Sequence, residues 1–166
     1  GRLRGARVEW AITGAFGDNL DEPARQVALK ANLSEADVSG LRALGVCINY
    51  NGYGPSLDDL HFHPSELYAA LYEAGHPGAF IDSDSFRQLS EGYSQDVAAS
   101  KALAPALIKP GFAMYQLPNT AWARRVSGVF SNDLVRAHPA RAHAVLTEQD
   151  DGTFLVSVRA PFHHRF

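Results

Sequence analysis

The stretch Phe112-Ala-Met-Tyr-Gln-Leu117 decides the fold class, because it is a short apolar run of strand-favouring residues bounded by glycine and proline. A helix with one apolar face is expected after it and should end before Pro139. Residues 142–148 and 153–159 are then expected to be two strands, since the Asp151-Gly152 step between them is a strong hairpin signal. The inward side of the helix is expected to hold Trp122, Val126, Val129, Phe130 and Leu134. The end of the chain is therefore predicted to be an α+β lobe.

The residues before this stretch predict a mostly helical region. Helix start signals occur at Asp21, Ser34 and His63-Pro64, and a longer helix is expected over residues 85–103. Residues 49–55 combine glycine, tyrosine and asparagine, which favours a loop that can approach another surface closely. We place the boundary between the helical region and the strands near residues 105–111.

Size and composition limit the classes of protein to consider. The chain has 166 residues, 46% of them hydrophobic, which allows a core in one domain or in two small lobes. A formal net charge of −3 gives no overall attraction for nucleic acid, although local arginines could still bind phosphate. No apolar run approaches the roughly 20 residues that span a bilayer, and no signal-type segment is seen, so a cytoplasmic protein is expected.

Asp18 is the first candidate for a metal ligand. It follows the apolar segment Trp10-Ala-Ile-Thr-Gly-Ala-Phe-Gly17, whose glycines would let a carboxylate lean into a cleft. Hard divalent cations such as Mn²⁺ or Mg²⁺ prefer oxygen ligands of this kind. The alternative is an aspartate that caps the following helix, and a single acid needs further ligands to hold a metal.

Asp58, Asp59, His61 and His63 form the densest cluster of potential ligands in the sequence. The His-x-His spacing places both rings on one side of an extended segment, which suits a metal. The structural alternative is that His63 starts a helix, while His61 and Asp59 tie down a loop.

Two further groups are candidates for binding phosphate. Arg124 and Arg125 lie near a helix start, where backbone N–H groups, the helix dipole and guanidinium donors can act together. Ser157 and Arg159 alternate on one face of the last strand and could project into one cleft. For both groups the alternative is a solvated surface. His163 and His164 are close to the end of the chain and are not expected to be ligands.

Several other chemistries have no support in the sequence. It contains no Gly-x-Ser-x-Gly elbow, no Walker phosphate loop and no His-Glu-x-x-His helix. The single cysteine, Cys47, excludes an intrachain disulfide and a cysteine zinc site. Its apolar neighbours predict a buried, inert thiol.

Five segments, taken in order, resemble the later part of a bacterial DHH-family phosphoesterase. They are Trp10–Asn19, Asn49–Gly54, Asp58–Pro64, Trp122–Asn132 and Leu155–Arg159. The resemblance implies a two-lobed enzyme whose N-terminal α/β lobe binds a pair of divalent metals, usually manganese. It implies the end of that lobe at residues 1–20, a helical connector at 21–110, and the start of the α+β DHH-associated lobe at 111–166. The implied fold class is thus α/β passing into α+β.

The resemblance also implies roles for particular residues. Asp18 matches the aspartate of the fourth metal motif. His61 and His63 stay further candidate ligands for Mn²⁺ or Mg²⁺ on their spacing, since the resemblance assigns no chemistry to their segment. Arg159 and Ser157 match a Ser-x-Arg near the substrate phosphate. The family's earlier motifs, Asp-x-Asp, a later aspartate and Asp-His-His, are absent from the chain, as is the later Gly-Gly-Gly segment. The chain alone is therefore expected to be inactive.

The function expected from the resemblance is hydrolysis of a phosphodiester or phosphoanhydride in a nucleotide, oligonucleotide or polyphosphate. Asp18 would help bind the metals, and Arg159, with Arg124 or Arg125, would orient the substrate. The expected partner is a phosphate-containing small molecule or a short nucleic acid, with no membrane. The alternative function is a non-catalytic module that binds a nucleotide or a protein. A homodimer, formed through exposed apolar surface, stays open.

Overall fold

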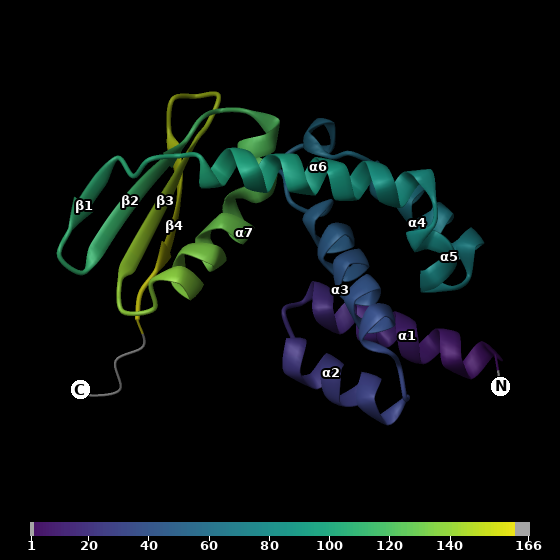
Figure 1. The fold of residues 1–166 in the computed structure, drawn as a ribbon. Coiled ribbons are helices and arrows are strands. Elements are labelled where there is room, and N and C mark those ends of the chain that lie inside the picture. Colours follow the sequence, from purple (N-terminus) through teal and green to yellow (C-terminus); the bar gives the residue numbers. More distant parts are fainter. Residues whose placement is uncertain (1, 162–166) are drawn as a thin grey trace. The chain divides into compact units, whose positions relative to one another are not determined.

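The computed structural model describes residues 2–161 and shows an α+β protein (Figure 1). The chain divides into two compact units. The first comprises Gly1–Gly52 and Leu60–Tyr93 and is called the helical unit here. The second comprises Tyr53–Asp59 and Ser94–Phe166 and is called the sheet unit.

The helical unit is built from helices whose ends follow local capping chemistry. The side chain of Ser34 accepts a hydrogen bond from the Asp37 N–H, and the Asp37 carboxylate accepts one from the Ser34 N–H, which completes a capping box. His63 caps the next helix, and Gly75 ends it with a φ of 65°. The elements are α1 (Arg2–Gly17), α2 (Asp21–Lys30), α3 (Glu35–Tyr50), α4 (Pro64–Ala74), α5 (Pro77–Ile81) and the first part of α6 (Asp84–Lys101).

Helices α1 and α3 approach each other at two glycines. A Cβ atom on Gly45 would lie 2.1 Å from the Thr13 carbonyl oxygen, and one on Gly17 would lie 2.8 Å from the Gly45 carbonyl oxygen. Only glycine at both positions therefore allows the two backbones to come this close. The contact lets Ile12 and Phe16 of α1 pack with Leu41 of α3, and all three side chains are buried.

Cys47 lies on the neighbouring part of α3, in a second apolar cluster with Leu44, Leu67 and Phe80. Burial raises the pKa of the Cys47 thiol to about 11. The thiol is therefore protonated at neutral pH, in agreement with the expectation of an inert buried cysteine.

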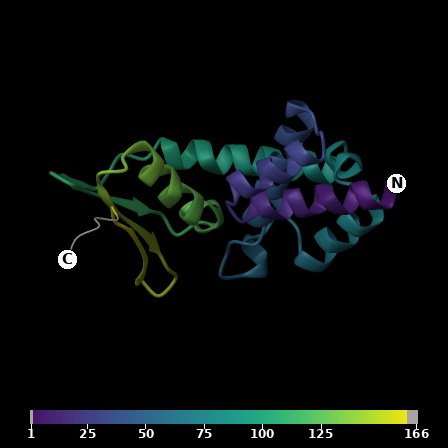
Figure 2. The same cartoon turned by 90° about the horizontal axis from the view of Figure 1, so that it is seen from below.

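The sheet unit contains a four-stranded sheet in the order β1-β2-β3-β4. Strands β2 and β3 are parallel and the other two pairs are antiparallel. A parallel pair needs a crossover connection, which α7 supplies, and Figure 2 shows α7 against one face of the sheet. The elements are η1 (Leu57–Asp59), β1 (Leu107–Lys109), β2 (Phe112–Leu117), α7 (Ala121–Ala137), β3 (Ala142–Glu148) and β4 (Phe154–Arg159).

The two faces of this sheet differ in burial. On one face Tyr115, Leu117 and Val145 pack with Val126 and Phe130 of α7 in a buried cluster. Because side chains alternate along a strand, the residues between these lie on the opposite face, called the open face here. The open face includes Phe154, Val156 and Val158, which are 41%, 55% and 58% exposed.

Most elements expected from the sequence are confirmed. The helices that start near residues 21, 34 and 64, the long helix near 85–103, and the strands at 112–117, 142–148 and 154–159 are all present. The end of α7 before Pro139 and its inward face are confirmed as well. Asp21 is the first residue of α2 and not its cap. The helix α1, the short helix η1 and two further short elements, α5 and β1, were not expected.

The α+β class is likewise confirmed, while the division at residues 20 and 110 stays a prediction. None of the helices in residues 2–161 is long and apolar enough to cross a membrane.

His143 is a buried titratable residue on β3. Its side chain is 0% exposed, and its Nδ1 atom has no hydrogen-bond partner among residues 2–161. Burial lowers the pKa of His143, and the charges of Arg141 and His138 act in the same direction, against the raising effect of a hydrogen bond to the His138 carbonyl. The folded protein therefore keeps His143 neutral at pH values where the unfolded chain, with a histidine pKa of about 6.5, already binds a proton.

This difference predicts a loss of stability as the pH falls below about 6.5. One proton contributes a slope of at most about 1.4 kcal/mol per pH unit to the free energy of unfolding. We expect His143→Gln to remove that slope between pH 6.5 and the lower folded pKa, as measured by urea unfolding at a series of pH values. His63→Asn, which keeps a helix cap at an exposed position, is the control and should leave the slope unchanged. Equal slopes in the wild type and His143→Gln would contradict the assignment.

Candidate functional site

A cavity of about 570 Å³ opens on the helical unit, between α1, α3 and α4. Gly14 and Gly75 are part of its lining, and at both positions the space that a Cβ atom would enter is open. The missing side chains thus help to form the cavity. The larger residues that line it are Trp10, Asp18, Ile48, Asn49, Tyr68, Leu71 and Tyr72.

Asp18 provides the carboxylate in this lining. It directly follows the last residue of α1, its N–H donates to the Gly14 carbonyl oxygen at 3.1 Å, and its side chain is exposed. The cap position of α2 is Leu20, without a side-chain cap, so the alternative that Asp18 caps that helix is wrong. Asp18 lies at the negative end of the α1 dipole, and its carboxylate adds to a local field that attracts cations.

Aromatic side chains form the wall of the same cavity. The Trp10 Nε1–H donates to the Gly75 carbonyl oxygen at 3.2 Å, which fixes the indole. Tyr68 and Tyr72, one turn apart on α4, stack with ring centroids 6.1 Å apart and are 67% and 77% exposed. The cavity therefore combines flat apolar surfaces with one carboxylate and the amide of Asn49, a combination suited to an organic ligand.

The two predicted histidine ligands have structural contacts in the helical unit. The His61 Nε2 atom lies 3.0 Å from the Tyr50 hydroxyl, and the ring lies so close to Gly92 that a Cβ there would be 2.5 Å away. The His63 Nδ1 atom accepts the N–H of Ser65 as the cap of α4. Neither histidine lines the cavity that Asp18 lines.

The fit of a metal to these residues is poor. Within residues 2–161 no group of three or more histidine, cysteine, aspartate or glutamate side chains could hold a metal ion. Asp18 alone cannot replace the water shell of Mn²⁺ or Mg²⁺. His163 and His164 lie outside the described residues. The described part of the chain does not by itself form the expected metal centre.

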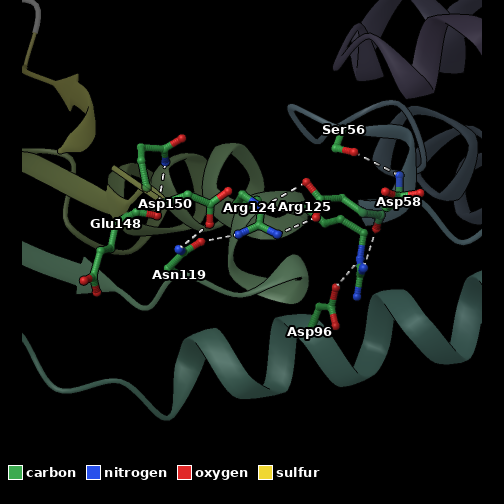
Figure 3. Close-up of polar contacts among 10 residues, drawn as sticks. Ser56, Asp58, Asp96, Asn119, Arg124, Arg125, Glu148 and Asp150 are labelled. Carbon is green, nitrogen blue, oxygen red and sulfur yellow. Dashed lines mark hydrogen bonds and ion pairs between the residues drawn. The ribbon is translucent and has the colours of Figure 1, made fainter. Parts of the chain in front are cut away.

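Arg124 and Arg125 are held in a network of ion pairs in the sheet unit (Figure 3). The Arg124 Nε and Nη2 atoms donate to the two carboxylate oxygens of Asp59, at 2.9 and 2.5 Å. Arg125 donates to the Asp96 carboxylate at 2.8 Å and to the backbone oxygen of Asp59. Arg124 also donates to the Asn119 side chain.

This network is largely removed from solvent. The side chains of Arg124 and Asp59 are 19% and 4% exposed, and those of Arg125 and Asp96 are 12% and 8% exposed. The hydrogen bond from Arg124 is the main cause that lowers the pKa of Asp59, against the raising effect of burial. The two arginines thus attach the short helix η1 to α7, and a phosphate would have to compete with buried carboxylates for them.

The sequence did not indicate these partners. Asp59 and Arg124 are 65 residues apart, and Asp96, 29 residues before Arg125, is one polar residue among many on a long helix. The structural alternative for Asp59, a residue that ties down a loop, is confirmed.

Ser157 and Arg159 lie together on β4. The register pairs Ser157 with Val145 and Arg159 with His143, so both project to the face of the sheet that α7 covers, at its edge. The Arg159 Nη1–H donates to the Ser157 hydroxyl at 3.1 Å, and the Arg159 side chain is exposed. The expectation that the two share one face is confirmed, and their guanidinium and hydroxyl groups are available to an anion.

Comparisons with family models, with curated proteins and with solved structures find no match for this chain.

Breaking the Asp59–Arg124 pair should destabilise the protein strongly. We expect Arg124→Ala to lower the free energy of unfolding by about 3–5 kcal/mol, because it leaves Asp59 buried without its partner. The loss in Arg124→Ala with Asp59→Asn should be clearly smaller than the sum of the two single losses. Urea unfolding of the four proteins in this cycle measures the coupling.

The exposed pair Arg87–Asp84, with side chains 65% and 92% exposed, is the control. Arg87→Ala should change the stability by less than about 1 kcal/mol. The coupling between Asp59 and Arg124 should be complete above the unfolded aspartate pKa of about 3.9 and should be lost as the pH falls through the lower folded pKa. A coupling as small as that of the exposed pair would show that the network is incidental.

Proposed function

We propose that this chain is part of a divalent-metal-dependent phosphoesterase of the DHH kind, which hydrolyses a phosphodiester or phosphoanhydride. The observation that carries the proposal is the exposed carboxylate of Asp18 at the end of α1, on a cavity large enough for a small organic phosphate. The ordered resemblance from Trp10 to Arg159 supports the same reading.

In this proposal Asp18 is one ligand of a metal centre, Asn49 is a second candidate, and the remaining ligands are not among residues 2–161. The carbonyl end of α1 favours a cation at this place, and Asn49 on the same cavity offers an amide oxygen of the type that Mn²⁺ and Mg²⁺ accept. His61 and His63 are less suited, since neither lines the cavity that Asp18 lines.

The phosphate of the substrate is assigned to Arg159 and Ser157. Arg159 is exposed and already aligned with the Ser157 hydroxyl, so the pair can donate two hydrogen bonds to one anion. Arg124 and Arg125 would have to give up buried carboxylate partners to do so. The substrates that fit are nucleotides, short oligonucleotides and polyphosphate.

The metal assignment is tested by adding Mn²⁺ to the ¹⁵N-labelled chain. Paramagnetic broadening detects weak binding, and we expect it to concentrate at Asp18 and Asn49. Asp18→Asn should weaken the Mn²⁺ affinity by roughly tenfold or more, because a charged ligand becomes neutral.

Asp82→Asn is the matched control, since Asp82 is also an exposed aspartate directly after a helix of the helical unit. It should leave the broadening at Asp18 unchanged. If the broadening at this cavity is the same in the wild type and in Asp18→Asn, the metal role of Asp18 is rejected.

The phosphate assignment is tested by binding of a small phosphodiester, bis(p-nitrophenyl) phosphate, followed by changes in the amide spectrum. We expect Arg159→Ala to weaken binding by roughly tenfold or more, as for loss of a charge-assisted hydrogen bond. Arg136→Ala, which removes another exposed guanidinium of the sheet unit, should have little effect. Equal losses in both variants would mean non-specific attraction.

The second candidate function is a non-catalytic module that binds a nucleotide or a protein. It is favoured by the lack, within the described ranges, of any group of three potential metal ligands. The two candidates differ in their response to metal. A binding module should bind its phosphate ligand equally well with and without Mn²⁺.

A further inference from the structure

Strand β4 is at the edge of the sheet in the part of the chain that the structure describes. The Gln149 N–H donates to the Thr153 carbonyl oxygen at 2.9 Å, which makes this a hydrogen-bonded pair next to the β3–β4 ladder. Because such pairs alternate in an antiparallel ladder, Leu155, Ser157 and Arg159 bond to β3. The N–H and C=O groups of Phe154, Val156 and Val158 therefore point away from the sheet.

The side chains of these same three residues lie on the open face. They are 41%, 55% and 58% exposed, although all three are large and apolar. Edge strands are usually protected by lysine, proline or a bulge. Along Phe154-Leu-Val-Ser-Val-Arg159 the only charge is at the last position. Both the backbone and the apolar side chains of β4 are thus ready for another strand.

We propose that a second copy of this chain pairs with β4 in an antiparallel manner, joining two sheets into one. Outward-pointing backbone groups can only bond to outward-pointing groups, so even-numbered residues must face even-numbered residues. In one register the outward backbone groups of Phe154, Val156 and Val158 all form bonds. It places Val156 opposite Val156 of the second copy and Phe154 opposite Val158 of the second copy. Apolar side chains then meet across the joint on the open face.

The charges of Arg159 and Asp151 favour an antiparallel pairing and a second copy of the chain as the partner. In this register Arg159 lies opposite Thr153 of the second copy, whose hydroxyl donates to the Asp151 carboxylate of that copy. The Asp151 carboxylate is held at this place by the Thr153 N–H at 2.9 Å and the Thr153 hydroxyl at 2.6 Å. The two-fold symmetry repeats the contact, and in the dimer a phosphate would compete with Asp151 of the second copy for Arg159. A parallel pairing would instead place arginine beside arginine and aspartate beside aspartate.

The first test is the mass of the chain in solution by sedimentation equilibrium over a range of concentrations. We expect a reversible monomer–dimer equilibrium. Val156→Lys should yield a monomer, because it sets two charges against each other at the centre of the joint. Val27→Lys, at another exposed valine on α2 that is 43% exposed, should leave the dimer intact. Circular dichroism would confirm that both variants fold.

The second test is a charge exchange. Asp151→Arg and Arg159→Asp should each raise the dimer dissociation constant roughly tenfold or more, since each change replaces two attractive contacts with repulsive ones. The double variant should restore the wild-type constant. A monomeric wild type, a dimer that survives Val156→Lys, or an unlimited aggregate insensitive to Asp151 and Arg159 would each overturn the proposal. A partner of another kind would leave the isolated chain monomeric.

Discussion

The buried pair between Asp59 and Arg124 is the interaction on which the organisation of the sheet unit depends. It links residues 65 positions apart and attaches η1 to the first turn of α7. Two charges at such a depth are stable only together, so the position of the 53–59 segment follows from the position of α7. Arg125 extends the constraint to Asp96 of α6. Residues 53–59, which look irregular in sequence, are therefore attached firmly to α7.

The regular elements could be predicted because their signals are local. Ser34 with Asp37, and His63 with Pro64, specify helix starts within four residues, and the Asp151-Gly152 turn specifies a hairpin. The two short elements could not be predicted in this way. Strand β1 has three residues and exists because the turn at Pro110-Gly111, with φ of 76° at Gly111, returns it to β2. Strand β1 is therefore stable only when it is paired with β2.

Residues of the candidate site could be predicted only where their neighbours in the sequence determine their position. An exposed Asp18 after a glycine-containing segment, and Ser157 with Arg159 on one face of a strand, follow from spacing. The partners of Arg124 and Arg125 follow from tertiary structure alone. Neither alternative read from the sequence, a phosphate site or a solvated surface, describes two guanidinium groups held by buried carboxylates. The burial of His143 could not be predicted for the same reason, because it depends on the packing of α7 against the sheet.

The reactivity of the buried Cys47 thiol reports how often the helical unit opens. It is the only cysteine in the chain, it lies in the apolar cluster of the helical unit, and its raised pKa keeps it unreactive while that unit is closed. A thiol reagent in excess would therefore modify the protein at the frequency with which the cluster around Cys47 opens. The rate at which the helical unit opens can thus be measured with the protein's own cysteine.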